Sequence, residues 1–228
     1  MTQTFELHPI LSQGDVRGVI FDLDGTLIDS AADIIQGMRL TFAQAGFGTL
    51  PDDYFPDNLH GTSEGIMRSI VSDMGWPMPV DFRMLRALYV ENYSALDHRR
   101  THLYDGAAAM LHACRDAGLP LGICTNKVHA SALKATEKVG IQPLFDVISG
   151  ADTWSAAKPS PIPLLETIRM LGLEPAQCLY FGDTSVDAAC AQQAGVRFVL
   201  HESGYGDLVL QRFPRHFAFD DWNDLLEA

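Results

Sequence analysis

Two aspartates stand one residue apart, Asp22 and Asp24, directly after the apolar run of residues 19–21. Carboxylates this close repel each other, and burying either one without a partner is costly. Two more carboxylates, Asp183 and Asp187, follow another apolar run late in the chain. Carboxylate oxygens are the ligands of hard cations, and Mg²⁺ is the usual cation when a phosphate is nearby. The sequence therefore predicts a Mg²⁺ ion that offsets the repulsion among these acids.

A lysine and a hydroxyl complete a set suited to phosphate chemistry. Thr125 ends a further apolar run, and Lys158 lies in a Pro-containing loop before a predicted helix. A phosphoryl group in its transition state carries charge on its equatorial oxygens, which need positive charge and hydrogen-bond donors. Mg²⁺, Lys158, Thr125 and the backbone N–H groups after Asp22 would supply both, and a carboxylate can act as the nucleophile. The sequence contains neither a GxxxxGK[ST] loop nor a Ser/His/Asp signature, so P-loop nucleotide hydrolysis and acyl transfer lack support.

Short apolar runs alternate with helical periodicity over most of the chain, which predicts a doubly wound parallel sheet, a Rossmann-like α/β core. The predicted strands are residues 18–21, 119–125, 145–150, 178–183 and 196–200. Ligands of such sheets bind at the carboxyl ends of the strands, beside a switch point in strand order. Every residue named above falls near such an end, so we expect them to meet at one edge.

Residues 31–100 have a different pattern, with helical periodicity and no convincing strand. Helices without intervening strands cannot extend the sheet, so this segment is predicted to be an inserted all-helical subdomain. The core would then comprise residues 1–30 and 101–228, with hinges near residues 29–32 and 98–104.

Composition limits the possible partners. The chain has 228 residues, is 47% hydrophobic and 20% charged, and carries a net charge of −13, which disfavours nucleic acid and anionic membrane as partners. Its four cysteines form no CxxC pair, which is typical of a reducing compartment. The first residues do not match a signal peptide, and no apolar run is long enough for a membrane helix. We expect a soluble, cytoplasmic protein.

Four sequence motifs, in order, resemble those of the haloacid dehalogenase-like hydrolase superfamily: Asp-Leu-Asp-Gly-Thr at residues 22–26, Thr125, Lys158, and Gly-Asp-Thr-Ser-Val-Asp at residues 182–187. This resemblance implies that Asp22 is the nucleophile and that Asp24 protonates the leaving oxygen and later activates water. It implies that Mg²⁺ is held by Asp183, the Asp22 carboxylate and the backbone carbonyl of Asp24. Asp187 would orient water or Lys158 from behind these ligands.

The resemblance also bears on the substrate. The helical insert is similar to the first class of mobile caps in this superfamily, which close over the site. An acid at the position of Asp24 is typical of the members that cleave phosphate esters. The runs around Thr125, Lys158 and Gly204 look most like phosphoglycolate phosphatases. We therefore expect hydrolysis of a small phosphorylated metabolite. A sugar phosphomutase or pyrophosphatase of the same superfamily and a catalytically silent binding module remain the alternatives.

Four weaker candidates have two interpretations each. Asn126 could donate to phosphate or substrate, or could have no part in binding. Thr62 and Ser63, in a loop of the helical insert, could touch substrate or only cap a helix. Lys127 could contact a substrate carboxylate or pair with a nearby acid.

Overall fold

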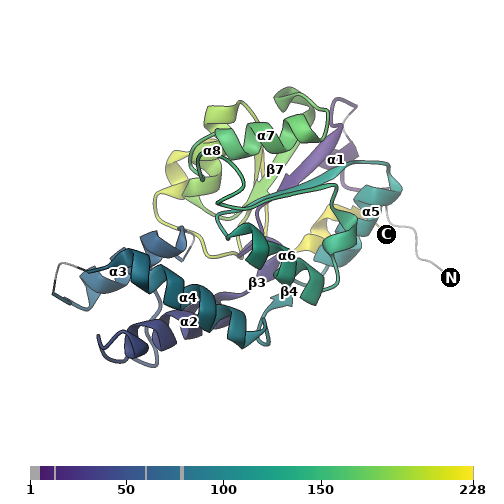
Figure 1. Ribbon diagram of the computed structural model, residues 1–228. Helices are drawn as coiled ribbons and strands as arrows, with labels where there is room; N and C mark the ends of the chain where they lie inside the picture. Colours follow the sequence, from purple (N-terminus) through teal and green to yellow (C-terminus); the bar gives the residue numbers. More distant parts are fainter. Residues whose placement is uncertain (1–5, 13, 60, 78–79, 228) are drawn as a thin grey trace.

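The computed structural model describes residues 6–12, 14–59, 61–77 and 80–227 (Figure 1). Its centre is a six-stranded, fully parallel sheet in the order β6-β5-β2-β7-β8-β9. The strands are β2 (Gly18–Phe21), β5 (Leu121–Cys124), β6 (Val147–Ser149), β7 (Cys178–Gly182), β8 (Arg197–His201) and β9 (Phe217–Phe219). From β2 the chain runs outward through β5 to β6, and it then crosses to β7 on the other side of β2, so the strand order reverses between β2 and β7.

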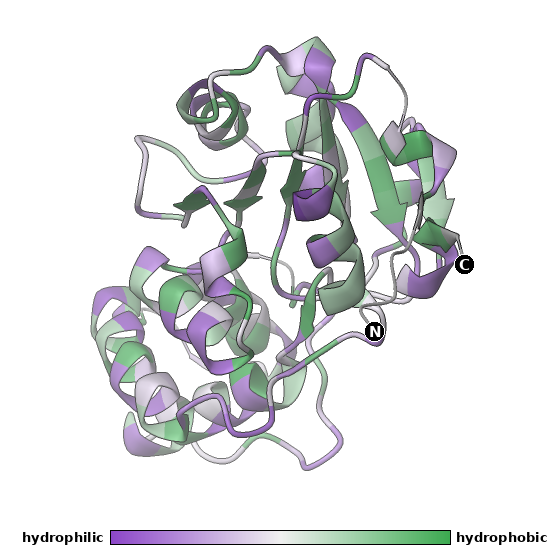
Figure 2. Cartoon of the chain, turned by 90° about the vertical axis from the view of Figure 1, so that its right-hand side faces the viewer, coloured by the Kyte–Doolittle hydropathy of each residue, from purple (hydrophilic) through white to green (hydrophobic). Residues whose placement is uncertain are grey.

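Helices cover both faces of the sheet. Val19 and Phe21 pack against α5 (Ala107–Asp116) and α6 (His129–Lys138), whereas Ile20 packs toward the opposite face. That second face is covered by α7 (Ile162–Met170) and α8 (Ser185–Ala194). Because successive side chains of a strand point to opposite faces, a strand covered on both sides must be apolar throughout. Figure 2 shows this continuous hydrophobicity along the strands, while the helices carry both kinds of residue. The predicted fold class is confirmed.

The segment between the first and second strands of the core is helical, as predicted. It contains α2 (Ala31–Gln44), α3 (Ser63–Asp73) and α4 (Phe82–Leu96), which pack around a hydrophobic cluster of their own. In Figure 1 these helices form a group beside the sheet rather than a layer on it. Met38, Phe42, Met67 and Leu85 are each 1% exposed or less, so this subdomain has a real core.

The two connections to the helical subdomain pair with each other, which the sequence did not indicate. β3 (Ile28–Asp29) runs antiparallel to β4 (His102–Leu103). Beside this ribbon, the buried Asp33 of α2 accepts hydrogen bonds from the Arg100 backbone N–H, at 3.0 Å, and from the Thr101 hydroxyl, at 2.8 Å. The outgoing and returning chains are therefore joined at the junction between the two parts of the molecule.

Short elements near the ends of the chain were also not predicted from the sequence. β1 (Glu6–Leu7) pairs antiparallel with β10 (Leu226–Glu227), and α1 (Pro9–Ser12) follows β1. The remaining elements are single 3₁₀ turns: η1 (Gln142–Leu144), η2 (Pro175–Gln177), η3 (Leu210–Arg212) and η4 (Trp222–Leu225). Elements of two to four residues are too short to show a periodic pattern. None of the described helices has the length and apolar character needed to cross a membrane.

We predict that Asp33→Ala lowers the free energy of unfolding by about 1–3 kcal/mol, because the Arg100 N–H and the Thr101 hydroxyl lose their buried acceptor. Urea denaturation measures the change. Asp53→Ala is the matched control, since Asp53 is exposed, and should change stability by less than about 0.5 kcal/mol. Equal stabilities of the two variants would mean that Asp33 does not secure the junction.

Candidate active site

Strand order brings the predicted residues to one edge of the sheet. Asp22 follows β2, Thr125 follows β5 and Asp183 follows β7, and β2 lies between the other two strands. The Asp22 N–H donates to the Phe181 carbonyl at 2.7 Å, which extends the ladder to the last position before the loops. Because parallel strands end at the same edge, residues more than 150 positions apart in sequence become neighbours (Thr26 and Asp183, 157 apart, are hydrogen-bonded).

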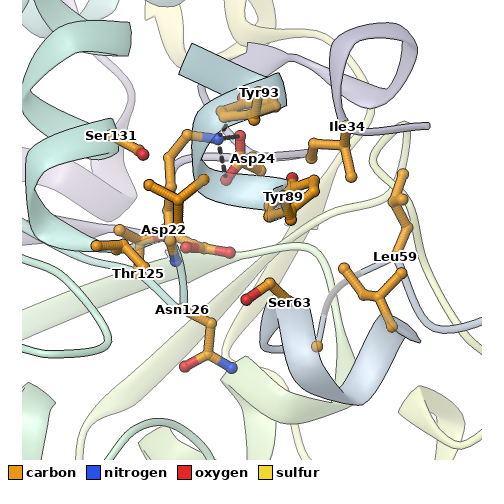
Figure 3. Close-up of a pocket in the computed structure, with 15 residues that line it drawn as sticks. Asp22, Asp24, Ile34, Leu59, Ser63, Tyr89, Tyr93, Thr125, Asn126 and Ser131 are labelled. Atoms are coloured by element: carbon orange, nitrogen blue, oxygen red, sulfur yellow. Dashed lines mark hydrogen bonds and ion pairs between the residues drawn. The ribbon is translucent and has the colours of Figure 1, made fainter. Parts of the chain in front are cut away.

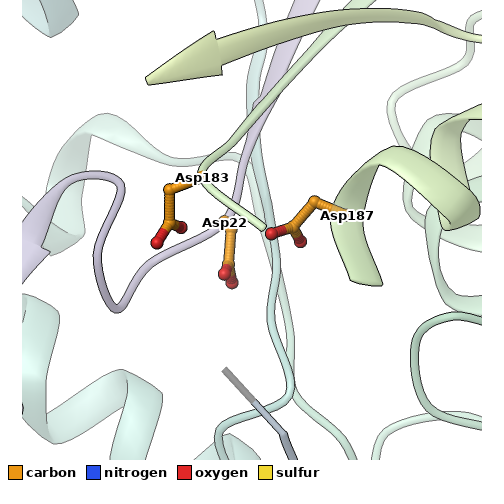
Figure 4. Close-up of side chains that lie close together, drawn as sticks. All are labelled: Asp22, Asp183 and Asp187. Carbon is orange, nitrogen blue, oxygen red and sulfur yellow. The ribbon is translucent and has the colours of Figure 1, made fainter. Parts of the chain in front are cut away.

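Three acidic side chains gather there. One carboxylate oxygen from each of Asp22, Asp183 and Asp187 lies within 4.8 Å of the other two. Figure 4 shows Asp22 between Asp183, in the loop after β7, and Asp187, at the start of α8. Asp183 and Asp187 are fully buried, and Asp22 is 8% exposed. This group of acids could hold a metal ion.

The electrostatics of Asp22 and Asp183 favour a cation between them. Burial raises the pKa of Asp22 to about 6, although the nearby Lys158 opposes the rise. Burial also raises the pKa of Asp183 well above its ordinary value, and repulsion from Asp187 and Asp22 adds to the effect. Asp22 Oδ1 is buried and accepts no hydrogen bond, although Lys158 Nζ lies 2.9 Å away. A set of buried carboxylate oxygens, two of them on acids with raised pKa values, suits a hard divalent cation such as Mg²⁺.

Asp187 differs because its oxygens are already engaged. It accepts from Lys158 Nζ at 2.5 Å, from the Tyr180 hydroxyl at 2.8 Å and from the Thr184 hydroxyl at 2.6 Å. Burial acts to raise the pKa of Asp187, but Lys158 and these hydrogen bonds hold it below its ordinary value. Asp187 therefore anchors the lysine, and in the first turn of α8 it forms a capping box with the N-cap residue Thr184.

Lys158 is held from several sides. Its side chain is 2% exposed, and its ammonium contacts Asp187, Asp22 and the Tyr180 hydroxyl, the last at 2.9 Å. Burial by itself lowers the pKa of Lys158, but Asp187 and Asp22 more than reverse this and raise the pKa above its ordinary value. The Asn126 amide binds the Lys158 backbone, with its Oδ1 accepting from the N–H at 3.0 Å and its Nδ2 donating to the carbonyl at 3.2 Å. Asn126 thus positions the lysine loop.

Asp183 is oriented by the loop after the first strand and by a loop near the C-terminus. Its Oδ1 accepts from the Thr26 hydroxyl at 2.7 Å, and its Oδ2 accepts from the Tyr205 N–H at 2.8 Å. Gly25 has φ +84°, and a side chain there would overlap the Asp183 carboxylate, so the close approach requires glycine. The Tyr205 hydroxyl in turn accepts from the Ser30 N–H at 2.8 Å.

Asp24 is engaged by a second lysine. Lys127 Nζ donates to both carboxylate oxygens of Asp24, at 2.8 and 3.0 Å, and to the Tyr93 hydroxyl of α4 at 2.8 Å. The Ser30 hydroxyl donates to Asp24 Oδ1 at 2.5 Å. Dashed lines in Figure 3 mark the contacts that join Asp24 and Tyr93 through the lysine. Of the two interpretations of Lys127, pairing with a nearby acid is the one that this structure contains.

A cavity of about 60 Å³ lies between the sheet edge and the helical subdomain. Asp22, Asp24, Thr125 and Lys127 line it from the sheet side, and Figure 3 shows Ile34, Leu59, Tyr89 and Tyr93 on the other side. Ser63 also lines it, whereas the Thr62 hydroxyl accepts from the Gly65 N–H at 3.2 Å and caps α3. His60 of the same loop lies outside the described residues.

Several residues of the site were not identified from the sequence. Tyr180 and Thr184 support Asp187, Tyr93 supports Lys127, and Ser30 and Tyr205 connect the junction with Asp24 and Asp183. The Thr-x-x-Asp spacing of residues 184–187 carried a capping signal. Tyr93 and Tyr180 carried no comparable signal, because an aromatic residue in a helix or strand usually indicates only packing. Tyr205 lies in a loop, where no periodic pattern indicates the partner of a side chain.

Comparison with known proteins gives concordant results. A family model described as haloacid dehalogenase-like hydrolase matches residues 19–201. The phosphoglycolate phosphatase of Cereibacter sphaeroides (strain ATCC 17029 / ATH 2.4.9) is 34% identical over 211 residues, covering 91% of this chain and 95% of that protein. That of Aquifex aeolicus is 32% identical, covering 83% and 86%. A crystal structure of a predicted phosphoglycolate phosphatase from Haemophilus somnus has a TM-score of 0.85 at 22% identity, covering 93% and 97% of the two chains.

We predict that Asp187→Asn lowers the free energy of unfolding by about 3–5 kcal/mol, because it removes one charge of a buried ion pair and leaves Lys158 undercompensated. Urea denaturation measures the change. Glu64→Gln is the matched control, since it breaks an exposed ion pair with Arg68, and should cost less than about 1 kcal/mol. A loss for Asp187→Asn no larger than that of the control would refute the structural role of Asp187.

Proposed function

Because the chain belongs to the haloacid dehalogenase-like hydrolase family, we propose that it is a Mg²⁺-dependent phosphomonoesterase that forms an aspartyl-phosphate on Asp22. Phosphoglycolate is the leading substrate. One observation carries the proposal: the Asp22 carboxylate faces a small cavity, with Lys158 Nζ 2.9 Å from it and Asp183 beside it.

The family match and the relatives confirm the predicted family, its phosphoglycolate phosphatase-like branch and the predicted class of enzyme, a phosphatase. The cofactor, the covalent step and the substrate are the proposed parts. They are supported by the chemistry of the donor set and by the names of the relatives.

In the proposed reaction, a carboxylate oxygen of Asp22 attacks phosphorus and the bond to the ester oxygen breaks. Asp24 gives a proton to the departing oxygen and then takes one from the water that attacks the phospho-Asp22. This second step releases inorganic phosphate and restores Asp22. Lys158 and the Thr125 hydroxyl would balance the charge on the equatorial oxygens. Mg²⁺ held by Asp22, Asp183 and the Asp24 carbonyl would neutralise both the acids and the phosphoryl group.

The substrate choice rests on the relatives. A cavity volume of about 60 Å³ accommodates only a few water molecules, so even a two-carbon phosphate ester would require the helical subdomain to move outward. The phosphoglycolate phosphatases among the relatives favour phosphoglycolate.

Asp22→Asn is predicted to lower kcat at least about 1,000-fold, because it removes the nucleophile while preserving the shape of the side chain. Phosphate release from phosphoglycolate measures kcat, and circular dichroism checks the fold. The exposed Asp53→Asn serves as the control and should keep full activity. Activity of Asp22→Asn above about 1% of wild type would contradict the covalent mechanism. Phosphate release by the wild type without a bisphosphorylated primer would exclude a phosphomutase.

Removal of divalent ions is predicted to abolish activity, and Mg²⁺ should restore it. Binding to the folded state raises stability, so Mg²⁺ should also raise the Tm of the wild type. Asp183→Asn should lose that shift, because it removes a proposed ligand, whereas Glu64→Gln should keep it. Thermal denaturation with and without Mg²⁺ gives this readout independently of turnover. A Tm shift of Asp183→Asn equal to that of wild type would place the ion elsewhere.

A further inference from the structure

The hydrogen bonds of Asp24 conflict with its proposed role. An acid that serves the leaving oxygen must present a carboxyl oxygen to it. In this structure Lys127 donates to both oxygens of Asp24, and the Ser30 hydroxyl donates to Oδ1 as well. The carboxylate is thus bound on each oxygen by groups of the protein. Something must remove Lys127 before Asp24 can act.

Lys127 is well placed to exchange partners. It is the only cationic residue among the described residues that line the cavity, and its side chain is 6% exposed. Its ammonium has a second support, the Tyr93 hydroxyl of α4, and lies 4.9 Å from the centre of the Tyr93 ring. Tyr93 is itself buried, with its hydroxyl 3.4 Å from His98 Nδ1. The lysine would therefore keep its place when one carboxylate replaces another.

We propose that Lys127 binds the carboxylate of the substrate's leaving group and thereby releases Asp24 to serve the ester oxygen. This inference rests on the proposed function and concerns the same site. In phosphoglycolate one methylene group separates the ester oxygen from the carboxylate. If Asp24 reaches the ester oxygen, it also lies close to the substrate carboxylate. Lys127 already contacts Asp24 at 2.8 Å, so the lysine is near both groups.

The exchange would make the enzyme select substrates by the charge of the leaving group. A buried ammonium is costly without an anionic partner, so Lys127 stays on Asp24 unless the substrate brings a replacement. A substrate with a carboxylate provides that replacement and keeps the ammonium paired. A phosphate ester with a neutral leaving group does not, and Asp24 stays engaged. Selection for an anionic leaving group thus acts on kcat as well as on binding.

The test compares phosphoglycolate with 2-hydroxyethyl phosphate, in which a hydroxymethyl group replaces the carboxylate. The wild type should prefer phosphoglycolate by about 100-fold or more in kcat/KM, on the scale of one charged hydrogen bond. Lys127→Met should remove most of this preference, mainly by slowing phosphoglycolate, while 2-hydroxyethyl phosphate is hydrolysed at an equal or higher kcat. Lys127→Arg keeps the charge and should retain part of the preference. Lys134→Met, which removes an exposed lysine paired with Asp97, is the control and should retain all of it.

Each contrary result has a separate meaning. Equal losses on both substrates in Lys127→Met would make the lysine a structural residue and overturn the inference. Equal kcat/KM values of the wild type on the two substrates would overturn the inference. This result needs no variant, so it decides the question even if Lys127→Met fails to fold. If the wild type prefers phosphoglycolate and Lys127→Met keeps that preference, the inference is rejected while the proposed function stands. Failure of the wild type on both substrates would reject the proposed function as well.

Discussion

The buried ion pair between Lys158 and Asp187 is the interaction on which the site depends. The two charged atoms are 2.5 Å apart, and the side chains are 2% and 1% exposed. Two isolated charges could not remain so deeply buried, and each is stabilised by the other together with the Tyr180 hydroxyl. The pair fixes the lysine beside Asp22 at the end of β2. It also joins the start of α8 to the loop before α7. The contact that positions the proposed catalytic lysine therefore also stabilises the fold.

A second ion pair, Lys127 with Asp24, connects the sheet to the helical subdomain through Tyr93. The cavity lies between these two parts, so its size depends on how closely they approach. The β3–β4 ribbon and Asp33 hold the connecting chains together, which makes the junction a defined structure rather than two independent linkers. The helical subdomain and the core are therefore in contact at the junction, through Asp33, and again at Asp24, through Lys127 and Tyr93.

The two lysines address the problem that the net charge creates. A chain with a net charge of −13 repels an anionic substrate at long range, so attraction must be local. Lys158 lies beside the proposed nucleophile and Lys127 beside the proposed acid. Each ammonium is buried and paired with at least one carboxylate. The proposed substrate, a phosphate ester with a carboxylate, would meet one positive charge beside each of these two acids.

The sequence by itself determined the sheet and the identity of its edge residues. The run at residues 18–21 matches β2 because a strand buried on both faces must be apolar at each position. Asp22, Thr125, Lys158 and Asp183 were predictable because strand ends converge. Only the tertiary structure decided the partner of Lys127, the roles of Tyr93 and Tyr205, and the two-residue ribbon. Lys127 and Asp24 are 103 positions apart, and no local pattern encodes such a contact, because side-chain reach and burial decide it only after both parts have folded.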